Sequence, residues 1–367
     1  ARHGITWTFD REMPVGRFVN GDWYVVGPVT VSAIDPAPAN GRNGSGLNVS
    51  ARDDKCGFDD RIPFGRYDPA LFRAPPIELR PGDTLISTIS LDALPPPPPM
   101  LWRQGRDQRS PLRAAATLTC LPAPVPPDAF RPAYNGKDPT LRRARQLRRD
   151  LLPNLPRDGI PLRCHTGAGD RDFTPADAAR WFERPWLDLV LDEFGAPVEN
   201  MPVYGREFAR AVGMASLLLC LDLPAEEKEP ILIGLVQVGI DLWGLAQDGQ
   251  PATWRPLGGH GIGRKWPIVF AGWMLEDPRM QSPTKTLPDL IFSEDWQTMF
   301  DDSWTGARVV YAGHAGREGH PRHAGWGRYE HLPPEQWEFN AESWRRCCTS
   351  SAWRSASGRS PSSWQAP

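Results

Sequence analysis

Lysine is scarce in this chain of 367 residues. Only five of its 42 lysine and arginine residues are lysines, so arginine supplies most of the positive charge. A GC-rich genome explains such a bias without any function, whereas the functional explanation is arginine forks that hold carboxylate groups of a ligand. The formal net charge of −2 gives no bulk attraction for nucleic acid, and we predict no nucleic-acid partner.

Long apolar runs and paired cysteine motifs are also absent. No run approaches the ~20 apolar residues that a membrane-spanning helix needs, so we expect no membrane partner. The six cysteines form no Cys-x-x-Cys pair and settle neither a disulfide framework nor the redox compartment. Ala1 is either the mature end left by signal cleavage or an artificial boundary, and we expect a secreted or periplasmic protein.

The first third of the chain has the two-residue periodicity of strands. Apolar and polar residues alternate in four stretches that we predict to be strands: residues 5–9, 23–31, 84–90 and 114–121. Short strands separated by turn signals are typical of a β-sandwich, which we assign to residues 1–125. The proline-rich residues 126–139 are then predicted to be a linker.

Beyond residue 140 the apolar residues recur with the period of 3.6 that marks helices. Five helices are predicted, at residues 141–152, 174–194, 204–221, 226–247 and 267–275. Thr174 is a good N-cap for the second, and the fourth is apolar on nearly all sides, which predicts a buried helix. Buried helices joined by long polar loops indicate an incomplete (α/α) toroid or barrel over residues 140–348. The Ser- and Pro-rich residues 349–367 are predicted to be a disordered tail.

This α+β multidomain order resembles two groups of carbohydrate-active enzymes. They are polysaccharide lyases of the α/α-toroid type and inverting glycoside hydrolases with an (α/α) barrel. The resemblance lies in the order of a strand-rich part followed by a helical part. It implies a polysaccharide or oligosaccharide substrate, and the 16 tryptophans agree with it because exposed indole rings stack on sugars.

Candidate chemistry is concentrated in a glycine-rich loop between two apolar helices. The loop and its edges contain Trp254, His260, Arg264, Lys265 and Trp266. A phosphate-binding loop is excluded, because Arg264 follows the last glycine and Trp266 stands where Ser or Thr is required. Two interpretations remain. The glycines let the backbone approach a ligand that His260 and Arg264 face, or the loop is a tight connection in which His260 caps a carbonyl.

A second cluster precedes the third predicted helix and holds Glu199, Asn200, Tyr204 and Arg206. β-Elimination on a uronate needs a group that neutralises the carboxylate, a base that removes the C5 proton and an acid that protonates the leaving oxygen. We predict Asn200 or Arg206 as the neutralising group, His260 as the base and Tyr204 as the acid. The predicted substrate-binding residues are Arg206, Arg264, Lys265, Trp254, Trp266 and Glu199. The competing interpretation makes Asn200 an N-cap and Tyr204 a packing residue.

The leading hypothesis is therefore a polysaccharide lyase that acts on a uronic-acid-containing polymer. An inverting glycoside hydrolase is the first alternative, in which Glu199 and Glu294 are the carboxylates that we expect to point inward. A non-catalytic glycan-binding protein is the second. We predict no cofactor, because the histidine series matches no common zinc pattern; a structural or catalytic divalent metal remains the alternative. That series is His314, His320, His323 and His331.

Overall fold

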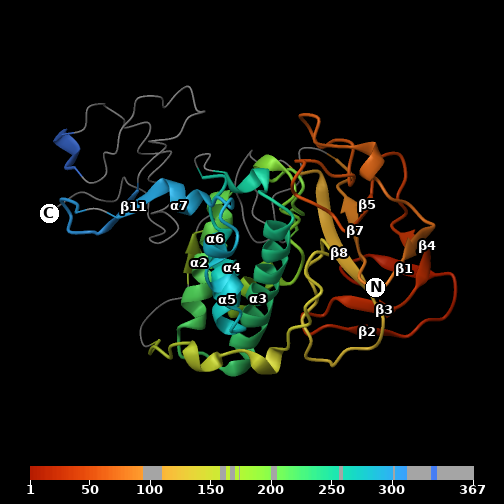
Figure 1. Cartoon of the computed structure of the whole chain (residues 1–367), viewed down its shortest axis with the longest axis horizontal. Coiled ribbons are helices and arrows are strands. Elements are labelled where there is room, and N and C mark those ends of the chain that lie inside the picture. The colour runs from red at the N-terminus through yellow and green to blue at the C-terminus, as the bar shows by residue number, and fades with distance from the viewer. Residues whose placement is uncertain are drawn as a thin grey trace.

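The computed structural model shows a mixed α+β protein. It describes residues 1–93, 110–157, 163–165, 170–172, 174–199, 205–255, 259–300, 302–311 and 332–336. The two larger sheets are formed before residue 122, and the helices begin at Pro175. In Figure 1 the sheets lie on the right, the long helices lie at the centre and a small β-hairpin lies at the left.

The strands that the structure describes in the first third of the chain form two sheets. The smaller sheet has the order β1 (Thr6–Phe9), β4 (Val29–Asp35) and β6 (Ile77–Leu79). The larger has the order β2 (Val15–Arg17), β3 (Trp23–Val26), β8 (Leu112–Leu121), β7 (Thr84–Ser90) and β5 (Ser45–Leu47). Only β3 and β8 run parallel among these strand pairs. The predicted strands are present, but the stretch 23–31 is divided at Pro28 into β3 and β4, which belong to different sheets.

The strands β7 and β8 of the larger sheet are buried on both faces. Leu85 of β7 and Leu118 of β8 share a core with Val31 of the smaller sheet. Ile86 and Ala115 belong instead to the core of the helices. Because alternate residues of a strand face opposite sides, β7 and β8 form the middle layer between the smaller sheet and the helices. The first third is sandwich-like, and helices cover the outer face of its second sheet.

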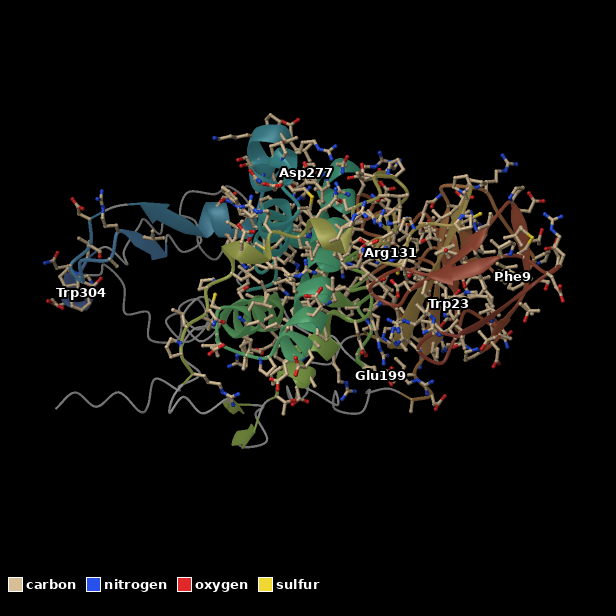
Figure 2. All side chains as sticks on the ribbon, turned by 90° about the horizontal axis from the view of Figure 1, so that it is seen from below. Phe9, Trp23, Arg131, Glu199, Asp277 and Trp304 are labelled. Atoms are coloured by element: carbon tan, nitrogen blue, oxygen red, sulfur yellow. The ribbon has the colours of Figure 1, made fainter. Side chains whose placement is uncertain are left out.

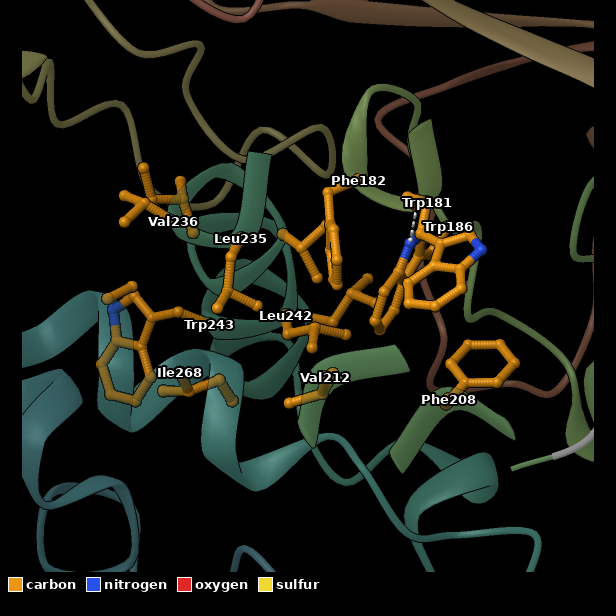
Figure 3. Close-up of a cluster of buried hydrophobic side chains, with 14 of the residues drawn as sticks. Trp181, Phe182, Trp186, Phe208, Val212, Leu235, Val236, Leu242, Trp243 and Ile268 are labelled. Atoms are coloured by element: carbon orange, nitrogen blue, oxygen red, sulfur yellow. Dashed lines mark hydrogen bonds between the residues drawn. The ribbon is translucent and has the colours of Figure 1, made fainter. Parts of the chain in front are cut away.

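The helices are arranged around α3 (Ala225–Gln247). Residues 231–246 of α3 are buried, and α1 (Pro175–Phe182), α2 (Gly205–Leu219) and α4 (Lys265–Met274) pack against it. Figure 3 shows Phe182 of α1, Val212 of α2 and Ile268 of α4 around Leu235 and Leu242 of α3. Among the described residues, the centre of the helical part is thus occupied by a helix, and the arrangement does not by itself establish a toroid.

Helix α3 is long and apolar, and it is surrounded by other parts of the protein. By length and composition alone it could cross a membrane, although 89% of its apolar 18-residue window is buried inside the protein. A helix that is apolar on all sides needs apolar neighbours on all sides. Here α1, α2, α4 and the segment 129–135 supply them.

Three short helices follow α4, and the chain then forms a hairpin. The helices are α5 (Pro278–Gln281), α6 (Pro283–Thr286) and α7 (Ser293–Gln297). The hairpin strands are β11 (Thr298–Phe300) and β12 (Val309–Tyr311), and β9 (Arg163–His165) pairs with β10 (Asp170–Asp172) earlier in the chain.

Two of the predicted helices were wrong in extent. Residues 141–152 contain only single 3-10 turns, at Ala144–Gln146 and Arg149–Leu151. Their backbone is bonded elsewhere, since the Ala144 N–H donates to the carbonyl of Asp128 and the Phe130 N–H donates to that of Arg142. The helix predicted at 174–194 has the expected Thr174 cap but ends at Phe182, before Pro185, which cannot continue the hydrogen-bond ladder.

The proline-rich segment 126–139 is not an exposed spacer. Arg131 is 1% exposed and pairs with Asp22 at 2.8 Å and with Asp241 of α3 at 2.6 Å. Figure 2 places the labelled Arg131 between the strands and the helices. Phe130 and Tyr134 on either side belong to the same core as the helices. The segment therefore joins the two parts of the molecule through a buried, charged contact.

Candidate functional site

The predicted site residues are described to different extents. Asn200 and Tyr204 lie outside the described residues, and for Arg206 only the backbone is described. The structure places the remaining six side chains: Glu199, Trp254, His260, Arg264, Lys265 and Trp266.

Arg264 is the structural centre of the glycine-rich loop. Its side chain is fully buried, and its Nε and Nη2 donate to the two carboxylate oxygens of Asp188 at 3.0 and 2.9 Å. Its Nη1 donates to the carbonyls of His260 and Ile262 at 2.7 and 2.8 Å. The guanidinium also lies 4.1 Å from the ring centroid of Phe208. These contacts hold the loop closed and leave Arg264 no exposed surface for a substrate carboxylate, so we reassign it from substrate binding to loop structure.

Trp254 is held by the same carboxylate. Its Nε1 donates to Asp188 at 2.7 Å, and its ring stacks on Phe292 with centroids 5.3 Å apart. The whole residue is buried. It therefore presents no indole face on which a sugar could stack, and we reassign Trp254 to the core as well.

His260 and Glu193 form a histidine–carboxylate pair at the edge of this buried cluster. The His260 side chain is 16% exposed, and its Nδ1 lies 3.4 Å from Oε2 of Glu193, which is only 1% exposed. The other oxygen of Glu193 lies 3.5 Å from Nη2 of Arg264. A carboxylate that accepts from Nδ1 selects the tautomer with its basic lone pair on Nε2 and orients the ring. This is the arrangement that a general base requires.

The backbone at Glu193 is held in an unusual conformation. Its φ is +59°, in the left-handed region that non-glycine residues rarely occupy. Such a conformation persists only where surrounding contacts fix it, and here His260 and Arg264 both bond the side chain. Glu193 is the partner that the sequence did not single out.

The start of α2 lies against the His260 loop. A Cβ atom at Gly205 would come within 1.9 Å of the carbonyl oxygen of His260 and within 2.3 Å of that of Gly259. Only glycine permits this approach of two backbones. Gly205 lies between Tyr204 and Arg206 of the predicted cluster, so the beginning of α2 and the His260 loop are neighbours. The assignment of His260 and the cluster to one site requires this proximity.

Glu294 anchors the far end of the loop. Its Oε1 accepts the backbone N–H groups of Gly263 and Lys265 at 2.8 and 3.4 Å. Burial raises the pKa of Glu294, which favours its neutral form. The residue is half-buried overall, and its carboxylate is directed into the loop.

Lys265 and Trp266 are the two predicted substrate-binding residues of the loop that remain accessible. The Lys265 side chain is 31% exposed and pairs with Asp295. Trp266 is 46% exposed, and its Nε1 donates to the Ser216 hydroxyl of α2 at 2.8 Å. Both residues are in the first turn of α4, directly after the buried Arg264.

Glu199 lies in a different setting. Its carboxylate pairs with Arg184, and its backbone N–H donates to the carbonyl of Arg113 at 3.0 Å, beside strand β8. Figure 2 labels it on the ribbon between the two parts of the molecule. Its described partners thus come from outside the glycine-rich loop.

Metal ligands do not converge in the part of the chain that the structure describes. There, no three or more His, Cys, Asp or Glu side chains are grouped so that they could hold a metal ion. The histidine series from His314 to His331 lies outside the described residues. Comparison of the chain with protein-family models, curated proteins and solved structures finds no match.

Proposed function

We propose that this protein is a polysaccharide lyase that cleaves a uronic-acid-containing polymer by β-elimination, with His260 as the base. The observation that supports this proposal is the His260–Glu193 pair, which is fixed from beneath by the buried Arg264. In the proposed fold the helices and their loops form an incomplete toroid with this pair at its mouth. Such an enzyme would act where polymers occur, in a secreted or periplasmic setting.

The proposed reaction assigns each proton. Asn200 or Arg206 neutralises the uronate carboxylate, which acidifies the C5 proton. His260 takes that proton on Nε2, the electron pair forms the C4–C5 double bond, and the C4–O bond breaks. Tyr204 donates its proton to the departing oxygen. The buried Glu193 carboxylate stabilises the imidazolium that forms on His260.

Lys265 and Trp266 are the proposed substrate-binding residues next to this base. The ammonium of Lys265 is accessible to a second carboxylate along the polymer, although Asp295 offsets part of its charge. Trp266 offers an exposed indole for a sugar ring. Both residues directly follow the loop that carries His260, so a chain that contacts them lies close to the base.

The test is incubation with alginate, glucuronan, hyaluronan and chondroitin sulfate, with the ultraviolet absorbance of the unsaturated product as the readout. Wild-type protein should produce that absorbance on at least one polymer. Tyr204→Phe and His260→Ala should each lower kcat about 100-fold or more, the usual contribution of general acid–base catalysis. Absence of the chromophore on all four polymers would remove the lyase proposal.

An inverting glycoside hydrolase is the second candidate, and one observation favours it. Glu294 is half-buried, and desolvation of its carboxyl raises its pKa, as a general acid requires. This candidate predicts new reducing ends without the unsaturated product. It also predicts that Glu294→Gln or Glu199→Gln abolishes activity while His260→Ala only weakens it. A glycan-binding protein without catalysis would bind polymer with no turnover.

A further inference from the structure

Two exposed tryptophans lie on one face of α4. Trp266 is 46% exposed and Trp273 is 51% exposed, whereas Trp181 of α1 and Trp243 of α3 are buried. Residues seven apart occupy the same face of an α-helix, about 10.5 Å apart along its axis. Large exposed aromatic side chains that share one face mark an interaction site.

The first of these rings is fixed in place before any ligand arrives. The Trp266 Nε1 donates to the Ser216 hydroxyl at 2.8 Å, which holds the indole against α2. Phe270, only 6% exposed and one turn further along α4, packs against the same ring with centroids 6.1 Å apart. A side chain that is already ordered loses little conformational freedom on binding, so its contacts contribute more to affinity.

We infer that Trp266 and Trp273 form a platform on α4 that binds an extended polysaccharide chain by stacking indole rings on sugar rings. The ring of a pyranose presents C–H groups on its flat face, and these pack well against an indole. Two rings separated by two helical turns suit an extended chain, in which successive sugar units lie in line. The platform rests on the proposed function for the choice of polymer, but stacking itself requires only that the ligand is a glycan.

The platform continues directly from the candidate site. Helix α4 begins at Lys265, immediately after Arg264, whose Nη1 is bonded to the carbonyl of His260. Trp266 is therefore in the helical turn next to the loop that carries the proposed base, and Trp273 is two turns further away. A polymer stacked on both rings would extend from the loop along the helix.

The chemistry of the face favours a glycan over a protein partner. Among the residues of α4, only the two tryptophans are exposed large apolar side chains; Ile268 and Met274 are buried. A protein interface instead has a contiguous apolar core of aliphatic and aromatic side chains. Near the Trp266–Ser216 hydrogen bond, the exposed aliphatic side chain is that of Leu217 in α2. One such side chain does not make a contiguous apolar core.

The test measures polymer binding separately from turnover. Native gels that contain alginate, glucuronan, hyaluronan, chondroitin sulfate or neutral xylan report binding as retarded migration. All variants are made in the His260→Ala background, so that the polymer is not degraded. Trp266→Ala and Trp273→Ala should each weaken binding roughly tenfold, the loss typical of a contact that dominates an interface. Trp273→Phe keeps an aromatic ring and should therefore retain part of the polymer binding.

Trp304→Ala is the matched control. Trp304 is 57% exposed in the loop between β11 and β12, and Figure 2 places it at the end of the molecule opposite the sheets. Its removal should leave retardation unchanged. The urea midpoints of Trp273→Ala and Trp304→Ala should stay close to that of the parent, because both rings are exposed. Trp266→Ala also loses the hydrogen bond to Ser216, so its midpoint should fall below that of the parent.

Several outcomes would overturn the platform. These are retardation by no polymer, equal retardation of the α4 variants and their parent, and an equal loss in Trp304→Ala. A dimer in sedimentation that dissociates in Trp273→Ala, without polymer binding, would make the face a protein interface. Tryptophan-dependent retardation without any turnover would leave the platform standing and remove the lyase proposal. Turnover by the wild-type protein, with binding that does not depend on the tryptophans, would support the lyase proposal and remove the platform.

Discussion

Arg264 holds together the residues on which the proposed chemistry depends. It is fully buried, bonds both oxygens of Asp188 and reaches the carbonyls of His260 and Ile262. A buried guanidinium of this kind stabilises only as long as its carboxylate and carbonyl partners all remain in place. The position of His260 is therefore set by a residue that does not itself meet the substrate.

Replacement of this guanidinium should be costly. We predict that Arg264→Met lowers the free energy of unfolding by about 3–5 kcal/mol, because Asp188 is left buried without a counter-charge. Urea unfolding monitored by circular dichroism measures this loss. Arg279→Met is the control, since Arg279 pairs with Asp277 at 2.7 Å but is 47% exposed and should cost no more than about 1 kcal/mol. Similar losses in the two variants would contradict the structural role given to Arg264.

The sequence could predict part of this site. The glycines and the types of side chain identified the loop, and Lys265 and Trp266 of that loop are accessible. The burial of Arg264 and Trp254 could not be predicted, because both depend on Asp188, a residue distant in sequence with no motif of its own. Glu193 was missed for the same reason.

At the scale of elements, α3 is organised by close contacts at its glycines. A Cβ at Gly239 would lie 2.2 Å from the carbonyl oxygen of Pro267 and 2.6 Å from the Cβ of Ala271, both in α4. The absence of a side chain thus lets α3 and α4 approach closely. In α2, by contrast, Gly213 has no heavy atom within 4 Å of the position that its Cβ would occupy.

These two glycines predict opposite effects of the same substitution. Gly239→Ala should destabilise by about 1–3 kcal/mol, because the new methyl group forces α3 and α4 apart. Gly213→Ala should stabilise by up to about 1 kcal/mol, because alanine has the higher helix propensity and meets nothing. Urea midpoints at fixed m-value measure both. A stabilising Gly239→Ala, or a destabilising Gly213→Ala, would show that the helix packing described here is incorrect.

The sequence predicted α3 well and the arginine-rich segment 141–152 poorly, for one physical reason. The apolar run at residues 231–243 has no alternative to burial, so its helical pattern was decisive. The segment 141–152 has equally good helix formers, but its backbone pairs with residues 128–130 and its arginines pair with distant carboxylates. Propensity is overridden where tertiary partners are available.

At the scale of the whole molecule, the sheets and the helices share one continuous core. Ile86 and Leu112 of the larger sheet belong to the same cluster as Trp181 and Leu242 of the helices. The N-terminus adds a polar contact, because Nη2 of Arg2 donates to the carbonyls of Asn20 and Glu183. The change from strand periodicity to helix periodicity in the sequence suggests two separate domains. It does not reveal that they share one core.

His3, next to Arg2, predicts a pH dependence of the free energy of unfolding. Burial, together with the charges of Arg2 and Arg184, lowers the pKa of His3 to about 3. The folded protein therefore keeps His3 neutral while the unfolded chain binds a proton below pH ~6.5, so the contribution of His3 is present above that pH and is lost as pH falls towards 3. The loss is about 1.4 kcal/mol per pH unit within this window.

Unfolding in urea at pH 7 and pH 5 tests this prediction. Wild-type protein should lose about 2 kcal/mol more than His3→Gln between the two values. The charges of Arg131 and Arg2 outweigh burial and lower the pKa of the nearby Asp22, so that carboxylate stays ionised at both pH values and the difference isolates His3. Equal losses in the two proteins would mean that His3 is not held neutral at the junction of sheets and helices.

His260 is the proposed base, and one rate measurement tests this role most directly. The measurement is the initial rate at which the unsaturated uronate appears from glucuronan or alginate, for wild-type protein, His260→Ala and Glu193→Gln at equal folded concentration. We predict absorbance from wild-type protein, a loss of about 100-fold or more in His260→Ala and a smaller loss in Glu193→Gln. Reducing ends without absorbance, or a His260→Ala variant at the wild-type rate, would contradict the account.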